Sequence, residues 1–162
     1  MGLTATATST GDTLRQEILI DGRHRLATDE PEQLGGTDTG PAPHELFPAA
    51  LAGCIATTMR MYARAKGWQL GRIEVGVDYD HQSVPRHFDV TITLPAGTTA
   101  EQRERLERVA QSCPLRRSIE AGIEFDERIV LAAGTSPRWQ MSNRGAGSEL
   151  GAARRISRTA DT

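Results

Sequence analysis

Apolar and polar residues alternate in four segments of the chain, and a period of two predicts β-strands. The first segment, residues 13–29, is predicted to be a hairpin with Asp21-Gly22 as its turn, because glycine adopts positive φ at no steric cost. Two half-buried strands are predicted over 72–79 and 87–94, each with one apolar and one polar face. A last strand is predicted over 123–131.

A longer apolar run between the hairpin and these strands predicts a helix over residues 43–66. Pro43 suits the first turn, where its missing N–H costs nothing, and Gly67 ends the helix. The first half is apolar on all sides, which is typical of a buried helix. Pro48 removes one backbone hydrogen bond, so the first turn is expected to be kinked or separate.

A second helix is predicted after Thr99-Ala-Glu-Gln102, a sequence typical of a capped N-terminus. Apolar residues follow at i, i+3, i+4 and i+7, namely Leu106, Val109, Ala110 and Cys113. This stripe is expected to face the core and to carry the Cys113 thiol inward. Pro114 follows at once, and a short helical turn is predicted after it.

The order of hairpin, long helix, two strands, helix pair and strand predicts an α+β fold. The domain is expected to span residues 12–133, between a flexible N-terminus at 1–11 and an Arg-bearing tail at 134–162 that is expected to be disordered. Residues 30–42 are rich in turn formers and are predicted to be a loop. Since one small sheet leaves much of the central helix bare, a second copy of the chain is expected to cover it in a homodimer.

The chain has 162 residues, 38% of them apolar, and a net charge of −2, which is typical of one soluble globular domain. That charge favours neither nucleic acid nor an anionic membrane as a partner. The sequence has no run of about 18 apolar residues and no basic, apolar leader, so we predict no membrane span and no signal peptide. A cytoplasmic location is therefore expected, where thiols stay reduced and a structural disulfide is disfavoured.

The two cysteines, Cys54 in the buried helix and Cys113 on the second helix, supply the candidate chemistry. A thiol peroxidase needs a thiolate that attacks the O–O bond and a second thiol that resolves the resulting sulfenic acid. It also needs a cation near the thiolate and a carboxylate that fixes the cation. Apolar surroundings at Cys54 favour organic hydroperoxides over hydrogen peroxide.

The sequence offers Glu45 as the carboxylate and an arginine of the hairpin, Arg25 or Arg23, as the cation. Arg25 is preferred, since it precedes the inward-facing Leu26, whereas Arg23 lies near the turn. A plainer interpretation stays open, in which the two cysteines are unrelated, inert core residues. No metal or organic cofactor is expected, because the histidines show no ligand spacing with the cysteines: His24, His44, His81 and His87.

Three parts of the sequence together form a specific pattern. The first is Gly40-Pro-Ala-Pro-His-Glu-Leu-Phe-Pro-Ala-Ala-Leu-Ala-Gly-Cys54, continued by Thr57-Thr58-Met59-Arg60-Met61-Tyr62-Ala63 and Lys66-Gly67-Trp68. The others are Asp29-Glu30-Pro31 with Gly35-Gly36-Thr37-Asp38, and Cys113-Pro114-Leu115 with Ser118-Ile119. Across residues 13–131 the chain resembles the OsmC/Ohr family of osmotically inducible and organic-hydroperoxide-resistance proteins, in its OsmC-like branch.

The resemblance implies an intertwined homodimer with active sites at the subunit interface, in which Cys54 is the peroxidatic thiol and Cys113 the resolving thiol. It implies reduction by a small or lipoyl-type dithiol rather than by a metal or flavin. Family members often carry the functional Glu one place earlier, so either His44 or Glu45 occupies that slot here. A His often follows the second Cys-Pro, where this chain has Arg116.

The leading hypothesis is a homodimeric, thiol-dependent peroxidase that reduces organic hydroperoxides to alcohols. Cys54 attacks, Arg25 and Glu45 activate, and Cys113 resolves. The second hypothesis is a stress-related sensing or ligand-binding protein whose cysteines react without turnover. The third is a structural dimer in which the cysteines only pack.

Overall fold

The computed structural model describes residues 2–131 of the chain. The chain divides into two compact units, Met1–Ala121 and Gly122–Thr162, and the first holds all the helices and strands of the described part. Three helices and two antiparallel sheets make up this unit, so the predicted α+β class is confirmed. The predicted tail at 134–162 lies outside the described residues.

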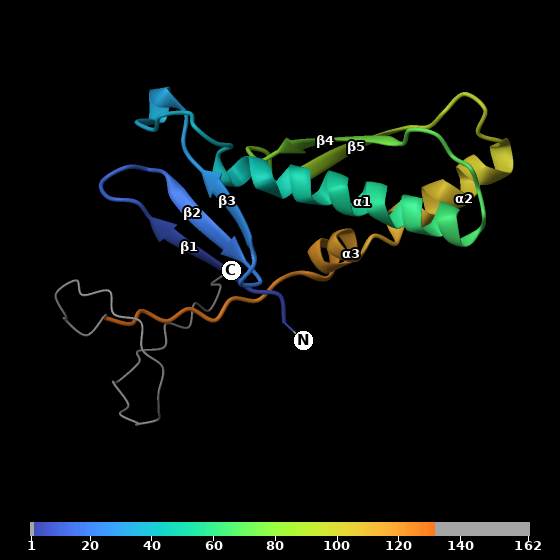
Figure 1. The fold of residues 1–162 in the computed structure, drawn as a ribbon. Helices are drawn as coiled ribbons and strands as arrows, with labels where there is room; N and C mark the ends of the chain where they lie inside the picture. Colours follow the sequence, from blue (N-terminus) through green and yellow to red (C-terminus); the bar gives the residue numbers. More distant parts are fainter. Residues whose placement is uncertain (1, 132–162) are drawn as a thin grey trace. The chain divides into compact units, whose positions relative to one another are not determined.

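The first sheet has three antiparallel strands in the order β1 (Ala5–Ser9), β2 (Gln16–Ile20) and β3 (His24–Thr28) (Figure 1). The predicted hairpin is confirmed, with Asp21 at φ 52° and Gly22 at φ 69° in its turn. Residues 5–9 were expected to be flexible but pair with β2 instead, from Ala5 opposite Ile20 to Ser9 opposite Gln16. A strand at a sheet edge is held by its backbone hydrogen bonds, so these small side chains can all stay exposed.

The long helix begins as predicted but in two parts. A 3₁₀ turn, η2 (Pro43–Glu45), precedes α1 (Leu46–Ala65), which agrees with the separate first turn expected from Pro48. An earlier 3₁₀ turn, η1 (Glu32–Leu34), lies within the predicted loop. The buried side chains of α1 recur every four residues on one face: Leu51, Ile55, Met59 and Ala63.

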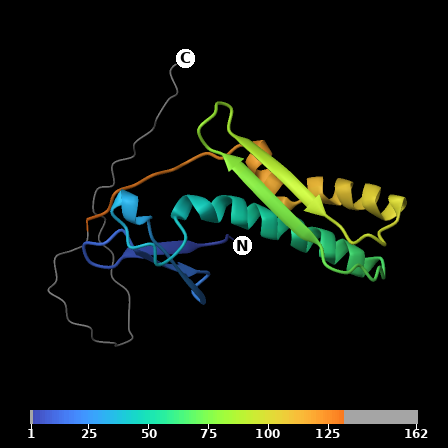
Figure 2. The same ribbon diagram turned by 90° about the horizontal axis from the view of Figure 1, so that it is seen from above.

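The second sheet is the antiparallel pair β4 (Glu74–Asp80) and β5 (His87–Thr93). In both strands exposed and half-buried residues alternate, as predicted. The half-buried face packs on α1, and Figures 1 and 2 place this strand pair alongside the helix. The α1 core is therefore covered by β4–β5 on one side.

The helices α2 (Ala100–Gln111) and α3 (Pro114–Ala121) complete the core around α1. Thr99 caps α2 as predicted: its hydroxyl accepts from the Gln102 amide at 3.2 Å, and the Gln102 side chain accepts from the Thr99 amide at 3.0 Å. Leu106, Ala110 and Cys113 are buried together with the α1 stripe. The predicted inward stripe of the second helix is confirmed.

The last predicted strand, residues 123–131, is wrong for this chain, because these residues carry no regular structure. Their apolar side chains are 60–88% exposed: Ile123, Phe125, Ile129, Val130 and Leu131. An isolated strand has no hydrogen-bonding partner, and alternation alone cannot supply one. Among the helices described, none is long and apolar enough to span a membrane.

Candidate functional site

The two cysteine side chains come together from α1 and from the junction between α2 and α3. Cys54 lies in the middle of α1 and is half-buried, whereas Cys113 is completely buried, at 0% exposure. Both belong to the core around α1, where Cys54 packs against the cluster that contains Cys113, Leu51 and Ile55. Packing of α2 and α3 on α1 therefore brings two thiols, far apart in the sequence, to one place.

Cys113 occupies the N-cap position of α3. It directly precedes Pro114, and its carbonyl accepts the first backbone hydrogen bond of that helix, from the Arg117 amide at 3.0 Å. The backbone amides of Leu115 and Arg116, in the first turn of α3, act to lower the pKa of its thiol. This is the usual arrangement of an N-cap side chain, here with sulfur in place of oxygen.

Cys54 packs against the core cluster that contains Cys113. Burial, and after it the neighbouring Cys54 side chain, raises the pKa of the Cys113 thiol, while the Arg116 and Leu115 amides oppose the shift. The Cys113 side chain is thereby kept protonated near neutral pH. Two cysteines packed in one cluster are candidates for a disulfide, which requires their Cα atoms to lie within about 7 Å.

A hollow of about 260 Å³ adjoins the helix segment around Cys54. Its walls are mostly apolar and come from α1, β5 and α3: Leu51, Ile55, Phe88, Val90 and Ile119. Arg116 and Glu120 add a charged edge and pair with each other at 2.7 Å. The hollow thus offers an apolar surface with one polar side next to the thiol region.

Glu45 and His44 lie together in η2, and both are exposed. The Glu45 carboxylate accepts a hydrogen bond from the Ala42 amide at 2.9 Å, which caps the turn. The His44 ring lies 5.8 Å from the Tyr79 ring and 5.1 Å from the His81 ring, measured between centroids. In this chain Glu45 stabilises the turn before α1, and His44 belongs to an aromatic group beside β4.

The predicted arginines lie on the first sheet or its turn. Arg25 is exposed on β3, opposite Leu19 of β2, and Arg23 is 4.0 Å from Asp21 in the turn. Within residues 2–131 no ion pair joins Arg25 or Arg23 to Glu45. The structure brings the two thiols together but does not join the predicted cation and carboxylate to each other.

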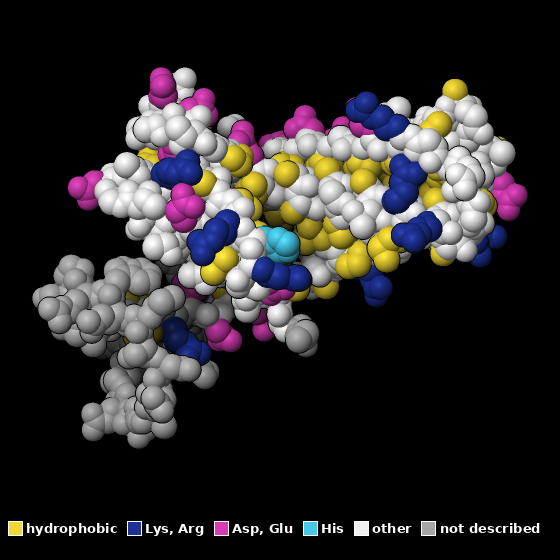
Figure 3. Space-filling model, viewed as in Figure 1, with side chains coloured by type: hydrophobic (Ala, Val, Ile, Leu, Met, Phe, Trp, Pro, Cys, Tyr) yellow, Lys and Arg dark blue, Asp and Glu magenta, His cyan; other side chains and the backbone are white. Residues whose placement is uncertain are grey.

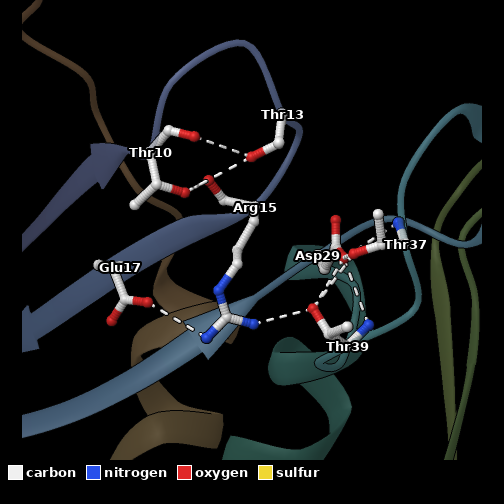
Figure 4. Close-up of polar contacts among 7 residues, drawn as sticks. All are labelled: Thr10, Thr13, Arg15, Glu17, Asp29, Thr37 and Thr39. Carbon is white, nitrogen blue, oxygen red and sulfur yellow. Dashed lines mark hydrogen bonds and ion pairs between the residues drawn. The ribbon is translucent and has the colours of Figure 1, made fainter.

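A third arginine, Arg15, was missed from the sequence and is the best-held cation of the hairpin (Figure 4). Its guanidinium donates to the Thr39 hydroxyl at 2.9 Å and to the Glu17 carboxylate at 3.2 Å. Residues at i and i+2 lie on one face of a strand, so the spacing of Arg15 and Glu17 was a usable signal. By the strand register, Glu17 and Arg25 also lie on that face.

The same network fixes the loop between β3 and α1, through an aspartate that is only 1% exposed, Asp29. One of its oxygens accepts from the Thr37 amide at 3.0 Å and the Thr39 hydroxyl at 3.0 Å (Figure 4). The other oxygen accepts from the Glu30 amide at 2.9 Å. The hydroxyl of Thr37 also donates to it and, with the other donors, holds the pKa of Asp29 well below its usual range.

Close backbone contacts tighten this loop further. A Cβ at Gly36 would lie 1.7 Å from the Glu30 carbonyl oxygen, and one at Gly40 would lie 2.9 Å from the Ala27 oxygen. Only glycine therefore fits at these two positions. In the described part of the chain, no group of three or more His, Cys, Asp or Glu residues could hold a metal ion.

Comparisons with known proteins agree with this arrangement. Residues 36–128 match the family model for OsmC-like protein. A search of curated proteins found no match. Many solved structures have the same fold, all of those compared below with less than 25% sequence identity, so they bear on the fold alone.

One similar structure is an osmotic stress induced and detoxification response protein from Psychrobacter arcticus, with 22% identity, a TM-score of 0.61, and coverage of 72% of this chain and 88% of that one. An OsmC-like protein from Mycoplasma pneumoniae has 16% identity and a TM-score of 0.62, over 74% and 88% of the two chains. An organic hydroperoxide resistance protein OsmC from Legionella pneumophila has 22% identity and a TM-score of 0.52, over 74% and 89%. The family model covers more than half of the sequence, and the chain belongs to the OsmC-like family.

Proposed function

We propose that this protein is a thiol-dependent peroxidase that reduces organic hydroperoxides to alcohols. The observation that carries the proposal is the packing of Cys54, half-buried on α1, against the core cluster that contains the fully buried Cys113. Two inert core cysteines need no such contact, and the separate capping of Cys113 by α3 gives its sulfur a fixed position. Several structural relatives are named organic hydroperoxide resistance proteins, in agreement with this reaction class.

The reaction has three steps. The Cys54 thiolate attacks the outer oxygen of the hydroperoxide, the O–O bond breaks, and the alkoxide leaves as an alcohol after taking a proton. Cys54 is then a sulfenic acid. The Cys113 sulfur attacks the Cys54 sulfur, the S–O bond breaks, and water leaves as the disulfide forms. A dithiol returns both cysteines to thiols and becomes a disulfide itself.

The apolar hollow, whose lining includes Leu51 and Ile55 on either side of Cys54 in the sequence of α1, favours an organic substrate. An alkyl or aryl group can displace water from the walls formed by Leu51, Ile55 and Phe88, which contributes about 25 cal/mol per Å² of buried apolar surface. Hydrogen peroxide has no apolar group and gains nothing there. We therefore expect a higher kcat/KM for organic hydroperoxides than for hydrogen peroxide. The proposal further includes a cytoplasmic location and a small or lipoyl-type dithiol as the reductant.

Arg25 and Glu45 remain the proposed activating pair, with His44 as the alternative to Glu45. A second candidate pair is Arg15 with Glu17, because this cation already has a carboxylate and a threonine to hold it. The function of the arginine is to stabilise the thiolate and the negative charge that develops on the peroxide oxygens. Either pair lies on a sheet or turn outside the core that holds the thiols.

The active form is proposed to be a homodimer. The face of α1 opposite its buried stripe carries exposed small and apolar residues, including Gly53, Thr57 and Met61, the last at 67% exposure. Figure 3 shows apolar side chains at the surface along α1. An exposed apolar face of this kind is typical of a subunit interface, and a second copy would bring a further set of arginines near the thiols.

The test is consumption of cumene hydroperoxide by the purified full-length protein with dihydrolipoamide or dithiothreitol as the reductant. Cys54→Ser should lower turnover by at least about 1,000-fold, because it removes the nucleophile. In the absence of a reductant, Cys113→Ser should reduce one equivalent of hydroperoxide and leave Cys54 as a sulfenic acid that dimedone labels. Hydrogen peroxide in parallel measures the selectivity. Equal consumption by wild type and Cys54→Ser would sink the peroxidase proposal and favour a sensing or ligand-binding role.

A further inference from the structure

The two sulfurs of the proposed disulfide differ sharply in access. The Cys113 side chain is 0% exposed and is enclosed by core residues such as Leu106 and Ala110. The Cys54 side chain is half-buried and lies on α1, one residue before a wall of the apolar hollow at Ile55. An external thiolate must reach one sulfur in line with the S–S bond, on the side away from the other sulfur.

We infer that the reductant attacks the sulfur of Cys54 and that Cys113 is the leaving thiolate when the disulfide is reduced. This inference rests on the proposed function, which supplies the disulfide and the dithiol. It names the direction of the exchange and the side from which the reductant approaches. The reductant is a thiol small enough, or extended enough, to enter beside α1.

The N-terminus of α3 offsets part of the cost that burial imposes on this leaving group. As Cys113 departs, negative charge develops on its sulfur, and the amides of Leu115 and Arg116 act to lower its pKa against the larger effect of burial. Amide donors and the positive end of a helix dipole both stabilise a thiolate at an N-cap. Cys54 has no comparable helix N-terminus, because it lies in the middle of α1, where the backbone amides donate hydrogen bonds within the helix.

Burial then slows the reverse reaction. The raised pKa of Cys113 means that the released thiolate takes up a proton near neutral pH, and the small thiolate fraction that is left attacks the new mixed disulfide slowly. The second thiolate of the dithiol attacks its own sulfur in that mixed disulfide, and Cys54 leaves as a thiolate. Each of the two steps breaks one S–S bond and forms another: the protein disulfide becomes the mixed disulfide, and the mixed disulfide becomes the disulfide of the oxidised dithiol. Two electrons pass from the dithiol to the protein disulfide.

The direction can be measured with a thiol that stops after the first step. The full-length protein is oxidised by diamide, exposed briefly to limiting 2-mercaptoethanol, quenched in acid and alkylated with N-ethylmaleimide. Arg60 and Arg108 separate the two cysteines into different tryptic peptides, which mass spectrometry can read independently. We expect the mercaptoethanol adduct on Cys54 and N-ethylmaleimide on Cys113, with at least a tenfold excess over the opposite pattern.

The same exchange in 8 M urea is the matched control, because unfolding gives both sulfurs equal access and should reduce the preference to about twofold or less. An adduct on Cys113 in the folded protein, or equal labelling of the two sulfurs, would overturn the inference. Failure of diamide to form the disulfide at all would overturn it too. A parallel sample oxidised with cumene hydroperoxide instead of diamide separates the two proposals. If cumene hydroperoxide forms no disulfide but the diamide-oxidised sample gives the expected labelling, the peroxidase proposal is contradicted and the direction of reduction is supported.

Discussion

The region that holds the thiols and the region that holds the candidate arginines are built in different ways. Cys54 and Cys113 are positioned by apolar packing among α1, α2 and α3, where their neighbours include fully buried side chains such as Ile55 and Leu106. Arg15 is positioned by a polar network that runs through Thr39 to Asp29. Arg25 and Glu45 have no such connection to each other within the described residues.

This difference between the thiol region and the arginine region indicates which of the two a single chain can order by itself. Packing in a core fixes side chains to within a fraction of an ångström and orders the thiols without outside help. The charged residues lie on exposed elements, where a surface ion pair contributes little to order by itself. Under the proposed function, each chain would order its own thiols, and the proposed assembly would supply the electrostatic half of the site.

The largest effect should come from a cavity in the thiol region. Leu106→Ala removes a completely buried side chain from the cluster that holds Cys113, and we expect a loss of about 2–5 kcal/mol in the free energy of unfolding. Urea denaturation followed by circular dichroism measures it. Leu34→Ala, at a position 67% exposed in η1, is the control and should change stability by less than about 0.5 kcal/mol. Equal effects of the two changes would contradict the assignment of Leu106 to the core.

Replacing the arginines one at a time sharpens the comparison on the other side. Alanine at the arginine that stabilises the reacting peroxide should lower kcat/KM for cumene hydroperoxide by about 100-fold. Alanine at the remaining positions among Arg15, Arg23 and Arg25 should change it by less than about threefold. Lysine at the sensitive position should restore part of the rate, because the charge returns without the two-pronged geometry. If all three substitutions left kcat/KM unchanged, the arginine that stabilises the peroxide would have to lie outside the hairpin.

The assembly step can be blocked on α1 itself. A side chain at Gly53 meets nothing within 4 Å in the single chain, so Gly53→Leu should fold but hinder the approach of a second helix. Sedimentation should give wild type twice the chain mass of 17.6 kDa and shift the variant toward that single mass. Ala100→Leu, at the exposed start of α2, controls for added bulk. A monomeric wild type with full peroxidase activity would break the link between assembly and the electrostatic half of the site.

The polar region should show its own pH dependence. The folded pKa of Asp29 is lowered, so its contribution to stability is complete above the ordinary value of 3.8 and is lost as the pH falls below that value toward the folded pKa. Asp29→Asn should lower the midpoint of thermal unfolding by several degrees at pH 7. The difference from wild type should shrink below about pH 4. Asp12→Asn, at an exposed turn position, should leave the midpoint unchanged at both pH values.

Much of the thiol region could be predicted from the sequence, because its signals are periodic and local. The run from Leu46 to Ala65 and the stripe from Leu106 to Cys113 repeat at helical spacing, and Thr99 with Gln102 forms a recognisable cap. The inward direction of Cys113 follows from that stripe alone. That its sulfur meets Cys54 depends on how three helices pack, which no local pattern encodes.

The polar region was harder to predict, for physical reasons that differ from residue to residue. β1 consists of Ala, Thr and Ser, so its side chains give no apolar signal, although its backbone pairs with β2. The role of Asp29 depends on a loop that returns to it after eight to ten residues. The apolar alternation at 123–131 is real, but a strand also needs a partner, and these residues pair with no strand of the described chain.

α1 has two stripes with different demands, and this determines which substitutions the helix can accept. Leu51, Ile55, Met59 and Ala63 must keep their volume, since the core closes around them. Gly53 and Thr57, one helical turn apart, are exposed in the single chain, so only a partner that packs on this face would restrict their size. Cys54 lies between these stripes and borders both of them. Because the two stripes make separate contacts, substitutions in the outer stripe are expected to be tolerated by the folded chain, whereas those in the core stripe are not.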